Sequence, residues 1–173
     1  MLPLLRGLAA AAALALAATL PATAQPVSLP ALSGPVILTV TGLDAAIVPD
    51  GQVAFDLGRL EALGLHSLDT SSIWTEGVHH YEGVLLHSVI EALGLSEVTL
   101  RLHALNDYKV DLPADEVTAE APLLAFRVDG ALLSVRDKGP IWLIYPFDSH
   151  ARYRTDTIFA RSVWQIERIE VLR

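Results

Sequence analysis

The final third of the chain places aromatic side chains close in sequence to basic ones. The aromatic residues are Trp142, Tyr145, Phe147, Tyr153, Phe159 and Trp164, and the basic ones are Arg136, Lys138, Arg152, Arg154 and Arg161. A guanidinium group beside an aromatic face can hold a flat, anionic ligand through stacking and paired hydrogen bonds. An aromatic core flanked by solvated arginines gives the same pattern, so both interpretations stay open.

The most compact basic element lies within 134-SVRDKGPIWLIYPFD-148. Arg136 and Lys138 precede a Gly139-Pro140 turn, and the apolar run that follows is typical of a buried strand. The two cations are therefore candidates for an anion site at the rim of a pocket. Alternatively, the basic side chains of residues 124–173 form the cationic half of a structural ion-pair network.

Other familiar catalytic patterns do not occur in the sequence. The six histidines follow neither the helical pair spacing nor the H-E-x-x-H spacing of zinc sites. The chain has no cysteine, which excludes disulfides, thiolate metal sites and a cysteine nucleophile. It has no G-x-S-x-G serine motif and no glycine-rich phosphate loop.

Charge is unevenly distributed over the 173 residues, whose formal net charge is −8. Residues 25–123 contain 14 acidic and 3 basic side chains, a balance of −11, whereas residues 124–173 contain 6 and 8, a balance of +2. The acidic part argues against nucleic acid or an anionic membrane as the partner.

The first 24 residues have the pattern of a signal peptide. Arg6 provides a positive start, an alanine-rich apolar run follows, and Ala22-Thr23-Ala24 fits a cleavage site. The apolar run is too short to span a bilayer comfortably, and no second run approaches spanning length. We therefore expect an exported, periplasmic protein without a transmembrane segment after cleavage, which folds without disulfides. Residues 25–35 then form a leader arm.

Residues 36–173 predict a single α+β domain, a β-rich mixed sheet with a few short helices. Strands are expected at 36–40, 53–56, 66–72, 78–82, 98–105, 108–112, 123–128, 131–135, 141–147 and 162–172. One helix is expected to begin after Asp56, which serves as its N-cap. A second is expected at 84–95, with Gly94 as its C-cap. A short helical turn is expected at 113–116. Asp129-Gly130 indicates a hairpin, and the extended segment at 78–82 is expected to end at Gly83.

The last strand carries a change of phase. Trp164 and Ile166 share one face, whereas Ile169 and Val171 share a face of opposite parity. A β-bulge at Glu167-Arg168 would return all four side chains to one side.

Five segments in order resemble the molybdopterin-binding domain of the sulfite oxidase family. They are 81-YEGVLL-86, 104-ALNDYKVDLP-113, 129-DG-130, 139-GPIWLIYP-146 and 162-SVWQIERIEV-171. The resemblance covers roughly residues 36–172 and implies the fold of that domain. It also implies a pyranopterin molybdenum cofactor, whose metal is bound by a cysteine thiolate a few residues before a tryptophan.

The resemblance also implies a set of pocket residues. Thr70, four residues before Trp74, stands at the position of the metal-binding cysteine, and Tyr81 stands where the family has a tryptophan. The candidate cofactor-binding residues are Thr70, Trp74, His80, Asn106, Asp107, Tyr108, Arg136 and Lys138. No residue is assigned as catalytic or as a metal ligand.

Two functions follow from the threonine at this position. A neutral hydroxyl is a poor substitute for a soft thiolate ligand. The first expectation is therefore a periplasmic module of this fold without molybdenum redox chemistry. It would bind a small anionic or planar ligand or dock on a partner such as a sensor protein. The alternative is a molybdopterin-dependent oxidoreductase that binds its cofactor without a cysteine, and a scaffold without a ligand is a third possibility.

Overall fold

The computed structural model describes residues 29–46 and 48–173, so the expected signal peptide and residues 25–28 of the leader arm lie outside the described residues. The first sheet has the strand order β2-β1-β10-β5-β6. Its strands are β1 (Leu38–Thr41), β2 (Gln52–Phe55), β5 (Thr99–Ala104), β6 (Lys109–Pro113) and β10 (Ile166–Leu172). The pair β1–β10 is parallel and the other pairs are antiparallel, which makes this sheet mixed.

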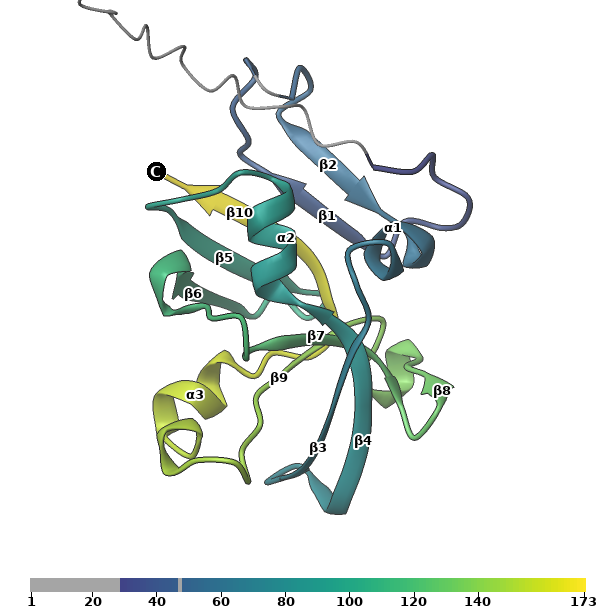
Figure 1. Cartoon of the computed structure of the whole chain (residues 1–173), viewed down its shortest axis with the longest axis vertical. Coiled ribbons are helices and arrows are strands. Elements are labelled where there is room, and N and C mark those ends of the chain that lie inside the picture. The colour runs from purple at the N-terminus through teal and green to yellow at the C-terminus, as the bar shows by residue number, and fades with distance from the viewer. Residues whose placement is uncertain (1–28, 47) are drawn as a thin grey trace, which may run out of the picture.

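The second sheet has the order β3-β4-β7-β8, and β9 also pairs with β7. Its strands are β3 (His66–Ser72), β4 (Thr75–Leu85), β7 (Leu123–Val128), β8 (Ala131–Leu132) and β9 (Trp142–Ile144). The first sheet occupies the upper half of Figure 1 and the second sheet the lower half. With three short α-helices, this is the α+β, β-rich single domain that the sequence predicts.

The three α-helices are five to seven residues long. They are α1 (Leu57–Glu61), α2 (Leu86–Ala92) and α3 (Asp156–Arg161), with 3-10 turns η1 (Ala114–Glu116), η2 (Val135–Asp137) and η3 (Ala151–Tyr153). Asp56 caps α1, as predicted, because its carboxylate accepts a hydrogen bond from the Arg59 N–H at 2.9 Å. Helix α3 was not predicted; its N-cap Thr155 accepts a hydrogen bond from the Ile158 N–H.

The expected end of the fourth strand at Gly83 is wrong. β4 continues to Leu85, and its register against β7 shifts between Glu82 and Gly83. A Cβ at Gly83 would lie 2.0 Å from the Leu124 carbonyl oxygen, so only glycine allows the two backbones to approach this closely. The strand therefore uses the first two residues of the expected helix, and α2 begins at Leu86.

Several expected strands are shorter than predicted, and the last strand begins at Ile166 instead of residue 162. β8 has two residues and gives way to η2, and β9 covers only Trp142–Ile144 of the expected run 141–147. The Asp129-Gly130 hairpin is confirmed, with φ of +50° and +80° at the two residues.

The bulge in the last strand is confirmed. The register between β10 and β5 shifts between Ile166 and Arg168, so Glu167 is the extra residue. Ile166, Ile169 and Val171 are all buried as a result. Trp164 precedes the strand and is half-buried, in a groove described below.

Candidate functional site

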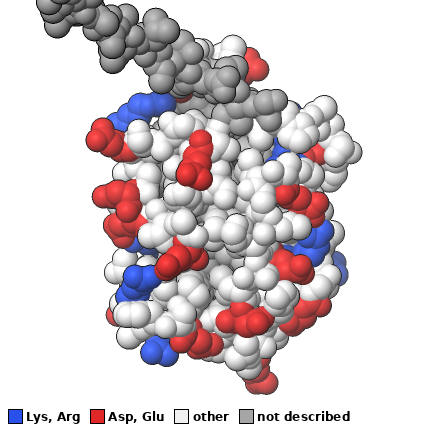
Figure 2. All heavy atoms as spheres, in the orientation of Figure 1, with Lys and Arg blue, Asp and Glu red and all other residues white. Residues whose placement is uncertain are grey.

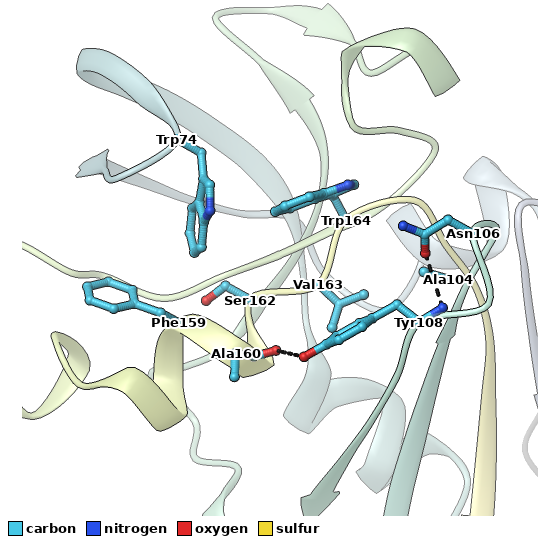
Figure 3. Close-up of a pocket in the computed structure, with 9 residues that line it drawn as sticks. All are labelled: Trp74, Ala104, Asn106, Tyr108, Phe159, Ala160, Ser162, Val163 and Trp164. Atoms are coloured by element: carbon cyan, nitrogen blue, oxygen red, sulfur yellow. Dashed lines mark hydrogen bonds between the residues drawn. The ribbon is translucent and has the colours of Figure 1, made fainter.

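An aromatic groove of about 380 Å³ opens where the β3–β4 turn, the β5–β6 turn and the α3 region meet (Figure 3). Its lining consists of Trp74, Ala104, Asn106, Tyr108, Phe159, Ala160, Ser162, Val163 and Trp164. Four of these residues are aromatic, and none carries a formal charge. The groove therefore suits a flat, mostly apolar group.

Trp74 is the centre of the aromatic packing beside this groove. Its ring lies edge-on to four other rings, with centroid distances of 6.0 Å to Trp142, 6.1 Å to Phe147, 5.9 Å to Phe159 and 5.8 Å to Trp164. Edge-to-face pairs at these distances are favourable beyond the area that they bury. The packing fixes the position of the Trp74 ring at the groove wall.

The opposite wall is set by the turn between β5 and β6. Asp107 has φ of +65°, and the Tyr108 N–H donates to Asn106 Oδ1 at 3.1 Å. The Tyr108 hydroxyl donates to the Ala160 carbonyl oxygen at 3.1 Å, which ties this turn to α3 (Figure 3). Tyr108 remains 45% exposed, so its ring is available to a ligand.

The structure brings together three of the eight candidate residues. Trp74, Asn106 and Tyr108 line the groove, although Trp74 lies more than 30 positions before the other two along the chain. Asp107 belongs to the same turn but does not line the groove. Thr70, His80, Arg136 and Lys138 lie elsewhere.

Thr70 is fully buried on β3 and has its own polar partners. Its hydroxyl donates to the Ser71 carbonyl oxygen at 3.1 Å and accepts from the Asp148 N–H at 3.3 Å. Ser71 in turn donates to the Asp148 carboxylate from its N–H at 2.6 Å and from its hydroxyl at 2.8 Å. These bonds, the Ser71 N–H first, lower the pKa of Asp148.

The side chains at the expected metal position do not fit a molybdenum centre of the thiolate-ligated kind. Thr70 offers a neutral hydroxyl that is already hydrogen-bonded and buried, instead of an exposed thiolate. Within residues 29–46 and 48–173, no group of three or more His, Asp and Glu side chains could hold a metal ion. We therefore derive no chemical step through this cofactor.

His80 lies on the exposed part of the β3–β4 hairpin. Its Nδ1 is 2.6 Å from Asp69 Oδ1, and this hydrogen bond is the main cause that raises the pKa of His80. The adjacent His79 bonds instead to Asp129, at 2.7 Å, on the other side of β4. The two histidines thus point to different neighbours, as adjacent residues in a strand must.

The expected cations do not meet at the groove. Lys138 lies with its Nζ 5.1 Å from the centroid of the Trp142 ring, and Arg136 is exposed on η2. Arg127, Arg152 and Arg161 each pair with a carboxylate, of Glu61, Glu120 and Glu116 respectively. These three arginines therefore form ion pairs, as the ion-pair interpretation expects.

On the side of the molecule shown in Figure 2, acidic side chains are spread over the surface with fewer basic ones among them. The described part of the chain has no helix that is long and apolar enough to cross a membrane.

Helix α3, which forms a wall of the groove, was not predicted from the sequence. The pair Thr155-Asp156, followed by the apolar residues Ile158 and Phe159, is the pattern of a helix start that could have revealed it.

No protein-family model and no curated protein matches this chain.

Proposed function

We propose that the protein is a periplasmic binding module with a sulfite-oxidase-like domain, and that its aromatic groove takes a planar, mostly uncharged ligand. The observation that carries the proposal is the set of four aromatic side chains from three separate segments around one uncharged groove of about 380 Å³. The export pattern in residues 1–24 supports the periplasmic location. The five ordered motifs support the domain type.

The groove offers both burial and orientation to a flat ring. Its volume lies in the range of small-molecule sites, which start at roughly 300 Å³. Trp74 and Phe159 form one end, Tyr108 forms the other, and Trp164 lies between them in Figure 3. The Asn106 amide nitrogen points toward Trp164 in that view, where it can donate to a polar edge of the ligand.

The groove favours a planar ligand over an anionic one. The groove lining contains no Lys or Arg side chain that could neutralise an anion. We therefore expect binding of neutral heteroaromatic rings and no binding of sulfate in this groove.

Isothermal titration calorimetry on the folded protein tests this, with a neutral pterin, indole and sulfate as probes. Binding of a ring probe should weaken by about tenfold in Trp164→Ala and in Tyr108→Ala, since each loses one wall of the groove. Leu132→Ala, an exposed apolar change on β8 outside the groove, is the matched control and should bind as the parent does. Equal affinities in all four proteins, or no binding of either ring, would overturn the proposal.

The oxidoreductase alternative has its own measurement. Protein purified from its native periplasm would have to contain molybdenum and pterin in amounts close to one per chain. Elemental analysis with neither present, from a host that makes the cofactor, would remove that alternative.

A further inference from the structure

A second pocket lies on the other side of α3 from the aromatic groove. It has a volume of about 290 Å³ and is lined by Leu112, Asp115, Glu116, Thr118, Ala121, Tyr145, Arg152, Tyr153, Ile158 and Arg161. Helix α3 supplies Phe159 and Ala160 to the groove and Ile158 and Arg161 to this pocket. The two sites therefore share a wall but have different chemistry.

Tyr145 gives this pocket a polar group without a partner. The residue is only 3% exposed, and its hydroxyl makes no hydrogen bond to any described residue. A buried hydroxyl without a hydrogen-bond partner is unfavourable unless a bound molecule supplies that partner. Burial raises the pKa of Tyr145, so the hydroxyl stays protonated and can donate. Tyr145 lines this pocket together with Arg161 and Glu116.

Arg161 is already engaged as an anion receptor. Two of its guanidinium nitrogens donate to the two carboxylate oxygens of Glu116. This is the paired geometry in which arginine binds a free carboxylate. The Arg161 side chain is 13% exposed, whereas that of Glu116 is 50% exposed on the short η1 turn. The arginine is thus held in place, and the glutamate is the partner that can leave.

Arg152 adds a second cation at the rim of the pocket. Its guanidinium lies 4.7 Å from the centroid of the Tyr153 ring and donates to the Tyr153 hydroxyl at 2.8 Å. It also pairs with Glu120 at 3.1 Å, but both of these side chains are mostly exposed. An exposed pair of this kind is weak and exchanges readily with solvent ions.

We propose that this pocket binds a small organic carboxylate, which replaces the Glu116 carboxylate on Arg161 and accepts a hydrogen bond from the Tyr145 hydroxyl. Glu116 is then an internal occupant that holds the site closed until the ligand arrives. The ligand carboxylate would satisfy the buried hydroxyl that Glu116 leaves without a partner. This inference does not depend on the aromatic groove or on the proposed function.

Calorimetry at pH 7 with acetate and succinate as probes tests the pocket, with sulfate as a separate arm for an inorganic oxyanion. Glu116→Gln keeps the side-chain shape but removes the competing charge, and should strengthen carboxylate binding by about tenfold. The matched control is Glu61→Gln, which removes the carboxylate of another partly buried arginine pair and should leave the affinity unchanged. Equal effects of the two substitutions would contradict an internal occupant.

Two further variants locate the ligand. Tyr145→Phe removes only the unpartnered hydroxyl, so the protein should fold at least as well as the parent while carboxylate affinity falls by roughly three- to tenfold. Arg161→Lys loses the paired geometry and should lower the affinity by at least about tenfold. Unchanged affinity in a folded Tyr145→Phe protein, or binding of sulfate but of neither carboxylate, would overturn the assignment.

The two sites can fail separately in these experiments. Trp164→Ala should leave acetate binding unchanged, and Glu116→Gln should leave binding of a ring probe unchanged. If the parent protein binds a ring probe but no carboxylate, the proposal for the second pocket is refuted and the proposed function is unaffected.

Discussion

Gly83 should be one of the least replaceable residues in the domain. An alanine Cβ there would lie 2.0 Å from the Leu124 carbonyl oxygen, 2.7 Å from its carbonyl carbon and 2.8 Å from the Ala125 Cα. All three atoms belong to the backbone of β7, so no side chain can rotate away. Relief requires β4 and β7 to separate where their register shifts, which weakens neighbouring hydrogen bonds. We expect Gly83→Ala to lower the free energy of unfolding by about 3 kcal/mol or more, at the upper end for overpacking.

A loss of this size is a large part of the roughly 5–15 kcal/mol that stabilises a typical domain. For a chain of this length it corresponds to a fall in Tm of about 6–12 °C, which thermal unfolding by circular dichroism measures. Gly34→Ala is the matched control, since its Cβ meets only Asp56 Oδ2 at 3.8 Å, an ordinary contact. Its effect should stay within about 0.5 kcal/mol. If the two variants unfold at the same temperature, the close approach of β4 and β7 is not a property of the folded protein.

Three other changes test the packing around the site. Trp74→Ala removes four edge-to-face contacts and should cost about 2–4 kcal/mol in chemical denaturation, whereas a cost below about 1 kcal/mol would mean that the ring is not packed as described. Thr70→Cys should give a thiol that reacts with a disulfide reagent only after unfolding, whereas Ser67→Cys, exposed on the same strand, should react at once. Asp56→Asn should be less stable than the parent at pH 7, and the difference should shrink as the pH falls from about 4 to about 2; a pH-independent difference would contradict this.

The sign of the last prediction follows from the hydrogen bonds to Asp56. The N–H of Ser33 at 2.6 Å and that of Arg59 at 2.9 Å, together with the N–H of Gly34 at 2.8 Å, lower the pKa of Asp56 from 3.8 to about 2. The folded state therefore releases this proton more readily than the unfolded chain. Its contribution to stability is complete above pH 4 and disappears as the carboxylate becomes protonated near pH 2.

Local features of the fold could be predicted because short-range chemistry determines them. Asp56 caps α1, Asp129-Gly130 takes the positive φ values of a hairpin, and the phase change at Glu167 becomes a bulge. Each of these depends on residues within a few positions of each other. The course of β4 through Gly83 could not be predicted, because its cause is the backbone of β7 about 40 positions later.

The candidate site also has parts that local sequence predicts and parts that only the packing of distant segments determines. The turn at Asn106 and Tyr108 could be identified locally, but its position opposite Trp74 depends on how the two sheets meet. The partner of Arg161 lies 45 positions away, and that of Arg127 lies 66 positions away. Charge counts show that cations and carboxylates are available, but only the fold determines which of them pair.

Backbone contacts account for two of the glycines in the segments that resemble the sulfite oxidase family, and for the lysine beside one of them. Gly83 allows close strand contact, and a Cβ at Gly139 would lie 2.2 Å from the Leu133 carbonyl oxygen. Lys138 has φ of +70°, its carbonyl oxygen accepts from the Gln165 N–H, and its ammonium lies over Trp142. These roles require a particular chain path and no cofactor. The presence of these segments therefore does not by itself imply a cofactor, and the groove and the pocket beside α3 are the places where we expect a ligand.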